Sequence, residues 1–404
     1  MTVDPDLSEL DAALAERGFD GYLLDAASEE SNQRYLSGFD APDPFVTLYT
    51  PEETALLVSS LEYGRAKSES RADTVYRWND FDLRERAQEV GRETARGDAL
   101  ADFLTEVGVS SVLVPRRFPL FSADALRERD VAVEPDGDEV VEDVRAVKTE
   151  TEVDHIRVAQ KANEAAMRAA EDLIAGAAVE DGVLHHAGEP LTSERVREEI
   201  EVTLLRHGCA LDETIVACGA DAAEPHNRGS GPLGAGEPII VDIFPRDKET
   251  KYHSDMTRTF VRGEPSEDAR DFYAVTEAAL DAALDALEAG VTGADVHGAV
   301  CDVYEDAGYP TLRSDPDTET GFIHSTGHGV GLDVHESPSV SDRADDELEA
   351  GHVVTIEPGL YDPDVGGVRI EDIVVVTEDG YENLTDYPVE FEVCARSSAS
   401  RCGR

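Results

Sequence analysis

The chain reads PIIVDIF over residues 238–244 and HSDMTRTF over residues 253–260, two apolar stretches that each carry an acidic residue. A polar segment that contains a proline separates them and predicts a turn between two strands. A lone carboxylate such as Asp242 costs several kcal/mol to bury in an apolar strand unless a partner or a metal ion compensates it. Pairing about residues 248 and 249 would place Asp242 opposite Asp255, where the two carboxylates repel unless a cation lies between them.

A second hairpin repeats this arrangement, with Glu357 on an apolar strand and Glu371 on the strand that returns. These acids follow those of the first hairpin by 115 and 116 residues, and helical patterns precede both hairpins. Pairing about residue 364 would place Glu357 opposite Glu371. We therefore expect an internal structural duplication that brings four carboxylates together.

The arrangement of these patterns predicts two domains. Residues 1–140 alternate helical and strand patterns, which is typical of an α/β domain, and contain no glycine-rich nucleotide-binding motif. An acidic segment with the sequence Pro-Asp-Gly then marks a boundary. We assign residues 145–392 to a second, α+β domain that contains both hairpins, and residues 393–404 to a disordered tail.

The charge is extreme, with 88 acidic and 35 basic residues and a formal net charge of −53. Such a surface repels phosphate, so we expect no nucleic-acid partner and no membrane partner. A disordered acidic chain is disfavoured because 41% of the residues are hydrophobic and fall in periodic runs. We interpret the charge as an adaptation to molar salt, as in a halophile, where the repulsion is screened. Without a membrane-spanning or signal-peptide pattern, we predict a cytoplasmic protein.

A glycine-rich segment between the hairpins carries three histidines, His324, His328 and His335. Glycines on both sides of His328 argue against a helix, so His324 and His328 are not the helical zinc pair of H-E-x-x-H enzymes. His328 is a candidate fifth ligand, whereas the sequence leaves open whether His324 is a core or a site residue. His226 lies in a polar loop, where a lone histidine is usually a surface residue.

Together these motifs resemble the pita-bread metallopeptidases, which include Xaa-Pro aminopeptidases, prolidases and methionine aminopeptidases. The resemblance covers residues 1–392 and implies a creatinase/prolidase-like N-terminal domain followed by a pita-bread (creatinase/aminopeptidase) catalytic domain. It implies five metal ligands, namely Asp242, Asp255, His328, Glu357 and Glu371. It also implies substrate contacts for His226 and His335 and supporting positions for His324 and Arg369. The segment after Asp242 reads Ile-Phe-Pro where the family commonly has a glycine, which we interpret as a loop adjustment.

This resemblance implies a hydrolase with two divalent metal ions. Oxygen-rich coordination with one imidazole suits Mn²⁺, which we favour, and is compatible with Co²⁺ or Zn²⁺. We expect Glu357 to accept the proton of the attacking water and His335 to polarise the scissile carbonyl. The expected substrate is a small peptide, and the family resemblance favours a homodimer.

The sequence favours an Xaa-Pro aminopeptidase, with an Xaa-Pro dipeptidase (prolidase) as the alternative. Prolidases of this family commonly have an arginine four residues after the histidine that matches His335, but this position is Ser339 here. Arg343 or Arg34 could bind a substrate carboxylate instead. A methionine aminopeptidase would lack the first domain. A creatinase-like enzyme or a metal-free binding module, as in some histone chaperones, is less consistent with five intact ligand positions.

Overall fold

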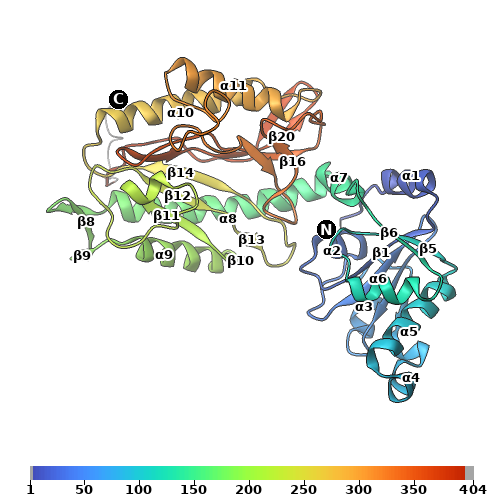
Figure 1. Cartoon of the computed structure of the whole chain (residues 1–404). Coiled ribbons are helices and arrows are strands. Elements are labelled where there is room, and N and C mark those ends of the chain that lie inside the picture. Colours follow the sequence, from blue (N-terminus) through green and yellow to red (C-terminus); the bar gives the residue numbers. More distant parts are fainter. Residues whose placement is uncertain (1–2, 396–404) are drawn as a thin grey trace. The chain divides into compact units, whose positions relative to one another are not determined.

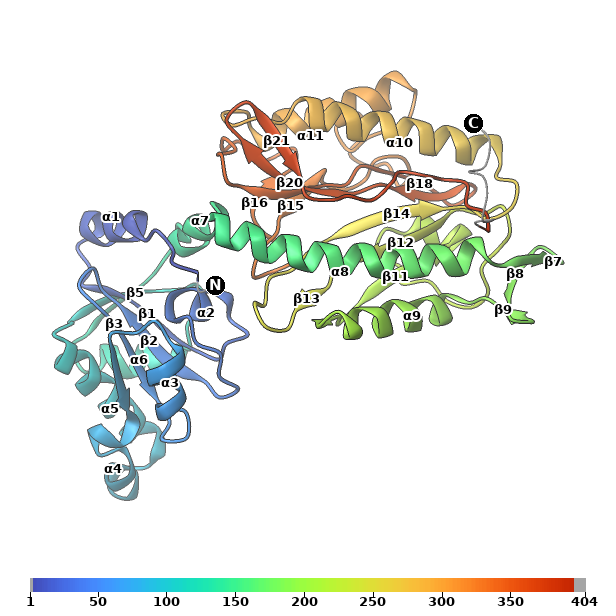
Figure 2. The ribbon, with the colours of Figure 1, turned by 180° about the vertical axis from the view of Figure 1, so that it is seen from behind.

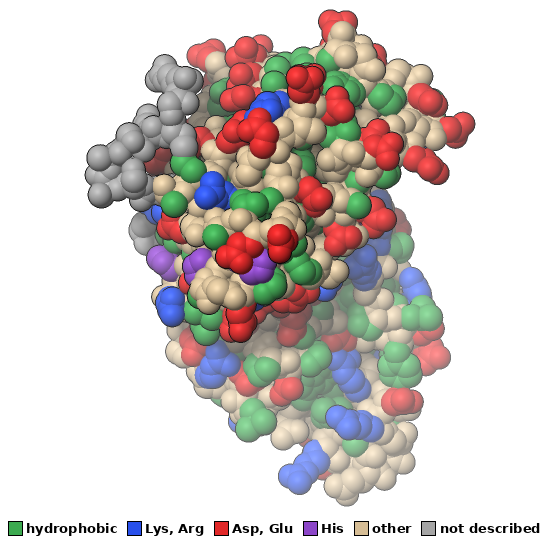
Figure 3. All heavy atoms as spheres, turned by 90° about the vertical axis from the view of Figure 1, so that its left-hand side faces the viewer, with side chains coloured by type: hydrophobic (Ala, Val, Ile, Leu, Met, Phe, Trp, Pro, Cys, Tyr) green, Lys and Arg blue, Asp and Glu red, His purple; other side chains and the backbone are tan. Residues whose placement is uncertain are grey.

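The computed structural model describes residues 3–395. The chain divides into two compact units, Met1–Arg145 and Ala146–Arg404 (Figure 1). Val393 packs into the core of the second unit, and the predicted tail beyond residue 395 lies outside the described residues. No helix of the described residues is both long and apolar enough to cross a membrane. On the face drawn in Figure 3, acidic side chains are scattered widely.

The first unit is built on one six-stranded sheet with the strand order β4-β3-β2-β1-β5-β6. The strands are β1 (Gly21–Ala26), β2 (Phe45–Tyr49), β3 (Thr54–Val58), β4 (Thr74–Arg77), β5 (Ser111–Val114) and β6 (Ala132–Pro135). The helices are α1 (Ser8–Arg17), α2 (Ser31–Ser37), α3 (Tyr63–Glu69), α4 (Leu83–Val90), α5 (Arg92–Val107), α6 (Leu120–Arg127) and α7 (Val140–Ala146), with a 3₁₀ turn at Trp78–Phe81.

Side-chain alternation along the strands gives this sheet two apolar faces. Leu57 of β3 packs with α5 and α6, whereas its neighbours Leu56 and Val58 pack on the opposite face with Ala66 of α3. Successive side chains of a strand point to opposite faces, so both faces of the sheet are buried. This arrangement agrees with the α/β character predicted for the first part of the chain.

The second unit contains two similar halves. In the first half, α8 (Glu150–Ala175) and α9 (Ser193–Arg206) precede a sheet of β11 (Thr214–Cys218), β12 (Ile239–Ile243) and β14 (Met256–Phe260). In the second half, α10 (Glu267–Asp285) and α11 (Gly293–Asp306) precede a sheet of β15 (Gly327–Gly329), β16 (Glu336–Val340), β17 (Val353–Ile356), β20 (Asp372–Thr377) and β21 (Gly380–Asn383). The helix pairs lie on opposite sides of the strands (Figure 2), and each pair has its own apolar core.

Shorter strands complete the second unit: β7 (Ala178–Glu180), β8 (Val183–His186), β9 (Glu189–Pro190), β10 (Cys209–Ala210), β13 (Arg246–Asp247), β18 (Gly359–Asp362) and β19 (Gly366–Arg369), with a 3₁₀ turn at Gly219–Ala223. Strand β13 pairs with β10, and β18 pairs with β19 in the turn of the second hairpin.

All four long helices of the second unit begin at a serine or threonine. The hydroxyl groups of Thr149, Thr192, Ser266 and Thr292 accept hydrogen bonds from backbone N–H groups three residues further on. Serine and threonine are preferred at this position because they satisfy N–H groups that the helix leaves free. The starts of these four helices were therefore predictable from the sequence.

The register of the first hairpin differs from the prediction. Asp242 pairs with Thr257 rather than with Asp255. The connection contains the short strand β13 and a backbone bridge between Arg246 and His253, which moves the turn by one residue. Because side chains alternate with a period of two, a shift of two residues keeps Asp255 on the face that Asp242 occupies. In the second hairpin the pairs Ile356–Asp372 and Gly359–Arg369 flank the two glutamates and confirm the predicted register.

Candidate active site

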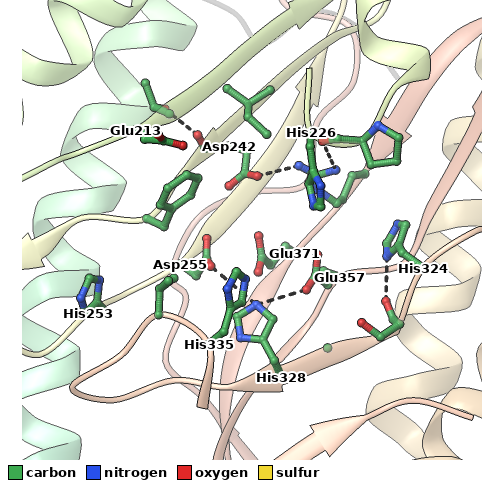
Figure 4. A pocket seen from close by; sticks show the side chains of 18 of the residues that line it. Glu213, His226, Asp242, His253, Asp255, His324, His328, His335, Glu357 and Glu371 are labelled. Atoms are coloured by element: carbon green, nitrogen blue, oxygen red, sulfur yellow. Dashed lines mark hydrogen bonds and ion pairs between the residues drawn. The ribbon is translucent and has the colours of Figure 1, made fainter. Parts of the chain in front are cut away.

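The two hairpins face a cavity of about 680 Å³ in the second unit. All five predicted ligands line it: Asp242, Asp255, His328, Glu357 and Glu371. Figure 4 shows their side chains pointing toward a common space. Asp255, His328 and Glu371 place one donor atom each within 4.8 Å of one another. The Nε2 atom of His328 lies 3.3 Å from Glu357 Oε1 and 3.9 Å from Asp255 Oδ2.

Some oxygens of this cluster are held by neighbouring side chains, and others have no partner. Glu371 accepts a hydrogen bond of 2.7 Å from the Thr257 hydroxyl, and Asp242 Oδ2 forms an ion pair of 2.6 Å with Arg369. The Oδ1 atoms of Asp242 and Asp255 are buried and lack a hydrogen-bond partner among the described residues. Unpaired buried oxygens of this kind fit a bound cation.

Burial and mutual repulsion disfavour the charged forms of these carboxyl groups. Burial raises the pKa of Asp255 well above its usual value, and the charge of Glu371 adds to the shift. Burial also raises the pKa of Glu371, with Glu357 as the largest charged contributor. The pKa of Glu357 rises to about 7 because of burial, which Arg369 partly opposes. Bound divalent cations would compensate both effects by stabilising the charged carboxylates, so the donor set fits metal ions.

Hydrogen bonds fix the tautomers of two histidines. His328 Nδ1 lies 3.1 Å from the Gly329 carbonyl oxygen, so Nδ1 donates and Nε2 keeps its lone pair toward the carboxylates. His324 Nδ1 likewise donates to the Ser325 carbonyl oxygen at 2.7 Å. Its Nε2 therefore accepts a hydrogen bond from the Tyr361 hydroxyl at 3.0 Å. A neutral His328 with a free Nε2 is the form that binds metal ions.

The other predicted residues lie around this cluster. The ring of His335 packs edge-on against that of His328, with centroids 4.2 Å apart, and burial lowers its pKa. His226 is exposed at the cavity wall. Arg369 donates hydrogen bonds to the Tyr361 hydroxyl at 2.9 Å and to the Pro225 carbonyl oxygen at 3.3 Å. Arg369 thus connects a carboxylate of the cluster to the loop that carries His226.

Sequence reasoning missed several residues of the site. Phe244, Arg246 and His253 line the cavity, and the buried Tyr361 contacts His324. The alternation that starts at Asp242 could have suggested Phe244 and Arg246, because every second residue of an extended chain lies on the same face. In the structure this pattern continues past the end of β12 at Ile243. Tyr361 gave no signal, because its contact with His324 depends on the folding of the second hairpin.

Arg343, one of the two arginines proposed in place of Ser339, does not line the cavity. Arg343 is 91% exposed and its nearest acid is the adjacent Asp342, at 3.9 Å. Arg34 belongs to the first unit, where it pairs with Asp40 at 3.6 Å. Ser339 itself lines the cavity, and its hydroxyl donates to Ser341.

The metal-free protein is expected to lose stability as the pH rises from about 4.3 to about 7. The pKa of Glu357 is about 7 in the folded protein, whereas a glutamate in an unfolded chain titrates near pH 4.3. Between these values the folded state binds more protons, so the free energy of unfolding falls with rising pH, by roughly 4 kcal/mol for this group.

Thermal unfolding of chelated protein at several pH values measures this loss. Glu357→Gln cannot ionise and should show a shallower decline than the wild type over the same pH range. Equal declines in the two proteins would contradict the assignment to Glu357.

Comparisons with known proteins agree with this geometry. Residues 154–378 match metallopeptidase family M24, and residues 7–158 match the creatinase/prolidase N-terminal domain. An Xaa-Pro dipeptidase of Pyrococcus furiosus is 30% identical over 358 residues, which are 88% of this chain and 90% of the relative.

Solved structures show the same fold. The Xaa-Pro dipeptidase from Bacillus anthracis is 26% identical, with a TM-score of 0.80 over 96% of this chain and 98% of that one. The X-Pro aminopeptidase from Thermotoga maritima is 27% identical, with a TM-score of 0.75 over 94% of this chain and 99% of that one. The predicted pita-bread fold is confirmed, and M24 metallopeptidases use divalent metal ions. The chain therefore belongs to metallopeptidase family M24 and carries a creatinase/prolidase domain in front of its catalytic domain.

Proposed function

We propose that the protein is an Xaa-Pro dipeptidase that uses two divalent metal ions, with Mn²⁺ preferred over Co²⁺ or Zn²⁺. The observation that carries this proposal is the cluster of four carboxylates and one neutral imidazole in a single cavity. Two of the carboxylates have buried oxygens without a partner among the described residues. Dipeptide substrates are favoured because relatives that match nearly the whole chain are named Xaa-Pro dipeptidases.

The proposed ligands are Asp242, Asp255, His328, Glu357 and Glu371. Divalent ions held there would act as Lewis acids and lower the pKa of water toward neutrality. Glu357 lies at the cluster, and we assign to its carboxylate the acceptance of a proton from the attacking water and its delivery to the proline nitrogen. Neutral His335 donates a hydrogen bond to the scissile carbonyl oxygen, where negative charge develops.

The remaining site residues hold this arrangement in place. Arg369 orients Asp242 through their ion pair and donates to the Tyr361 hydroxyl, which in turn donates to His324. We assign His226 to the wall that contacts the substrate. The homodimer and the cytoplasmic location expected from the sequence are part of the same proposal.

We propose a dipeptidase here, whereas the sequence alone favoured an aminopeptidase. The sequence favoured the aminopeptidase because Ser339 replaces an arginine, and kept the dipeptidase as the alternative. The relatives support the alternative better, although the Thermotoga maritima structure is an X-Pro aminopeptidase. An Xaa-Pro aminopeptidase therefore remains the second candidate.

Kinetics on matched peptides tests the proposal. We expect kcat/KM to be at least about tenfold higher for an Xaa-Pro dipeptide than for the Xaa-Pro-Yaa tripeptide, about 1.4 kcal/mol in the transition state. An Xaa-Ala dipeptide is the control for proline specificity. Chelated protein should be inactive, and added Mn²⁺ should restore activity.

Two outcomes would contradict parts of this proposal. Faster cleavage of the tripeptide would favour the aminopeptidase. Undiminished cleavage by metal-depleted protein would rule out the metal-dependent mechanism.

A further inference from the structure

We propose that Arg246 binds the C-terminal carboxylate of the substrate and thereby selects dipeptides, an inference that rests on the dipeptidase function proposed above. Three arginines line the cavity: Arg228, Arg246 and Arg369. Arg369 is buried and paired with Asp242, and Arg228 is paired with Glu213. Arg246 forms neither an ion pair nor a side-chain hydrogen bond with any residue that the structure describes. Of the three arginines, Arg246 is therefore the one whose guanidinium group is available to bind a ligand.

Arg246 begins β13, three residues after the end of β12, the strand that carries Asp242. Asp242, Phe244 and Arg246 line the cavity, whereas the intervening Ile243 and Pro245 do not. Four residues separate the acid from the arginine, so their Cα atoms lie at most about 13 Å apart. Both residues line the same cavity. Along the chain that lines the cavity, the carboxylate of Asp242 is followed by the aromatic ring of Phe244 and then by the guanidinium group of Arg246.

This order matches the chemistry of an Xaa-Pro dipeptide. With its reacting carbonyl group at the carboxylate cluster, the dipeptide would place its apolar proline ring against the aromatic side chain of Phe244. Its terminal carboxylate would then lie next to Arg246. In a tripeptide an uncharged amide takes the place of this carboxylate, and the negative charge lies about 3.5 Å further along the chain. A cation at a fixed position therefore distinguishes the two substrates.

The backbone of Arg246 is fixed on both sides. It pairs with Ala210 of β10 and forms a bridge with His253 on the returning strand. His253 lines the cavity as well, and its Nδ1 atom is buried without a hydrogen-bond partner among the described residues. In Figure 4 His253 lies to one side of the carboxylate cluster. The fixed backbone limits the positions that the guanidinium group can reach, and the flexible side chain is ordered only when a ligand binds.

The recognition that we infer is a bidentate ion pair. A guanidinium group is always charged and presents two parallel N–H donors that match the two oxygens of a carboxylate. Lysine at the same position would keep the charge but lose the paired geometry. Glutamine would keep similar bulk and remove the charge.

The test compares an Xaa-Pro dipeptide with the same dipeptide carrying a C-terminal amide, using Mn²⁺-loaded protein. For the wild type we expect a clear preference for the free carboxylate. Arg246→Gln should lower kcat/KM for the free dipeptide by about 100-fold, mainly through KM, and change that for the amide by less than about threefold. Arg246→Lys should recover part of the loss. Arg343→Gln, an exposed arginine outside the cavity, is the matched control and should behave as the wild type.

Binding of the dipeptide to metal-free protein, measured by calorimetry, gives a second readout that does not depend on catalysis. It should weaken in Arg246→Gln and not in Arg343→Gln. Equal losses on the free and amidated dipeptide would mean that Arg246 has only a structural role, and a selective loss in Arg228→Gln instead would show that the wrong arginine was chosen. If the wild type cleaves neither dipeptide, the proposed dipeptidase function is wrong. If the wild type cleaves the free dipeptide and Arg246→Gln does so equally well, only the role proposed for Arg246 is wrong.

Discussion

Replacing Glu371 with glutamine is expected to abolish peptide hydrolysis, with kcat/KM at least about 10³-fold lower than in the wild type. Glu371 is 2% exposed, and its donor atom lies within 4.8 Å of those of Asp255 and His328. Glutamine has nearly the same shape but carries no charge. The variant therefore removes a negative ligand from the centre of the proposed metal site while leaving the packing in place.

Metal content per chain and kcat/KM on an Xaa-Pro dipeptide measure this effect together. The matched control is Glu378→Gln, the same substitution at an exposed glutamate after β20, and it should retain both metal and activity. Loss of folding would not explain the result, because burial raises the pKa of Glu371 and removing its charge should raise the melting temperature of the metal-free protein. A variant with full metal content and near-normal kcat would show that Glu371 is not a ligand.

The architecture was predictable from local patterns. A helical pattern before the first hairpin corresponds to α8 (Glu150–Ala175), which begins where Thr149 caps it and has an apolar face along its length. The long strands were predictable because apolar runs end at turn residues. The seven-residue helices α2 and α3 of the first unit were missed, since they span barely two turns and have no side-chain cap.

The sequence predicted which residues form the site better than it predicted their strand register and their contacts. An acid such as Asp242 inside an apolar strand stands out in any sequence, because burial without a partner is unfavourable. The register that sets Asp242 against Thr257 depends on the short strand β13, whose two residues give no recognisable pattern. Contacts such as that between His324 and Tyr361 join positions 37 residues apart and arise only from the tertiary fold.

The protein is expected to be much more stable in molar KCl than in dilute salt, with a melting temperature at least about 10 °C higher at about 2 M than at about 0.1 M. The formal net charge of −53 makes the folded chain repel itself, and the unfolded chain lowers this repulsion by expanding. Salt shortens the screening length from about 10 Å at 0.1 M to about 3 Å at 1 M, which weakens the repulsion between neighbouring surface acids.

Salt also weakens exposed ion pairs, but this loss is smaller than the stability gained when salt screens the repulsion between acidic residues. Pairs such as Arg157–Glu382 and Arg270–Glu264 lie at the surface, where each contributes about 0–1 kcal/mol. With 88 acidic and 35 basic residues, the acids outnumber their possible basic partners by 53. Thermal unfolding at fixed metal concentration measures the shift, and sucrose in place of KCl controls for stabilisation by an excluded solute without screening. A melting temperature that stays constant across the KCl series, or that rises as much with sucrose, would show that charge repulsion does not limit the stability of this fold.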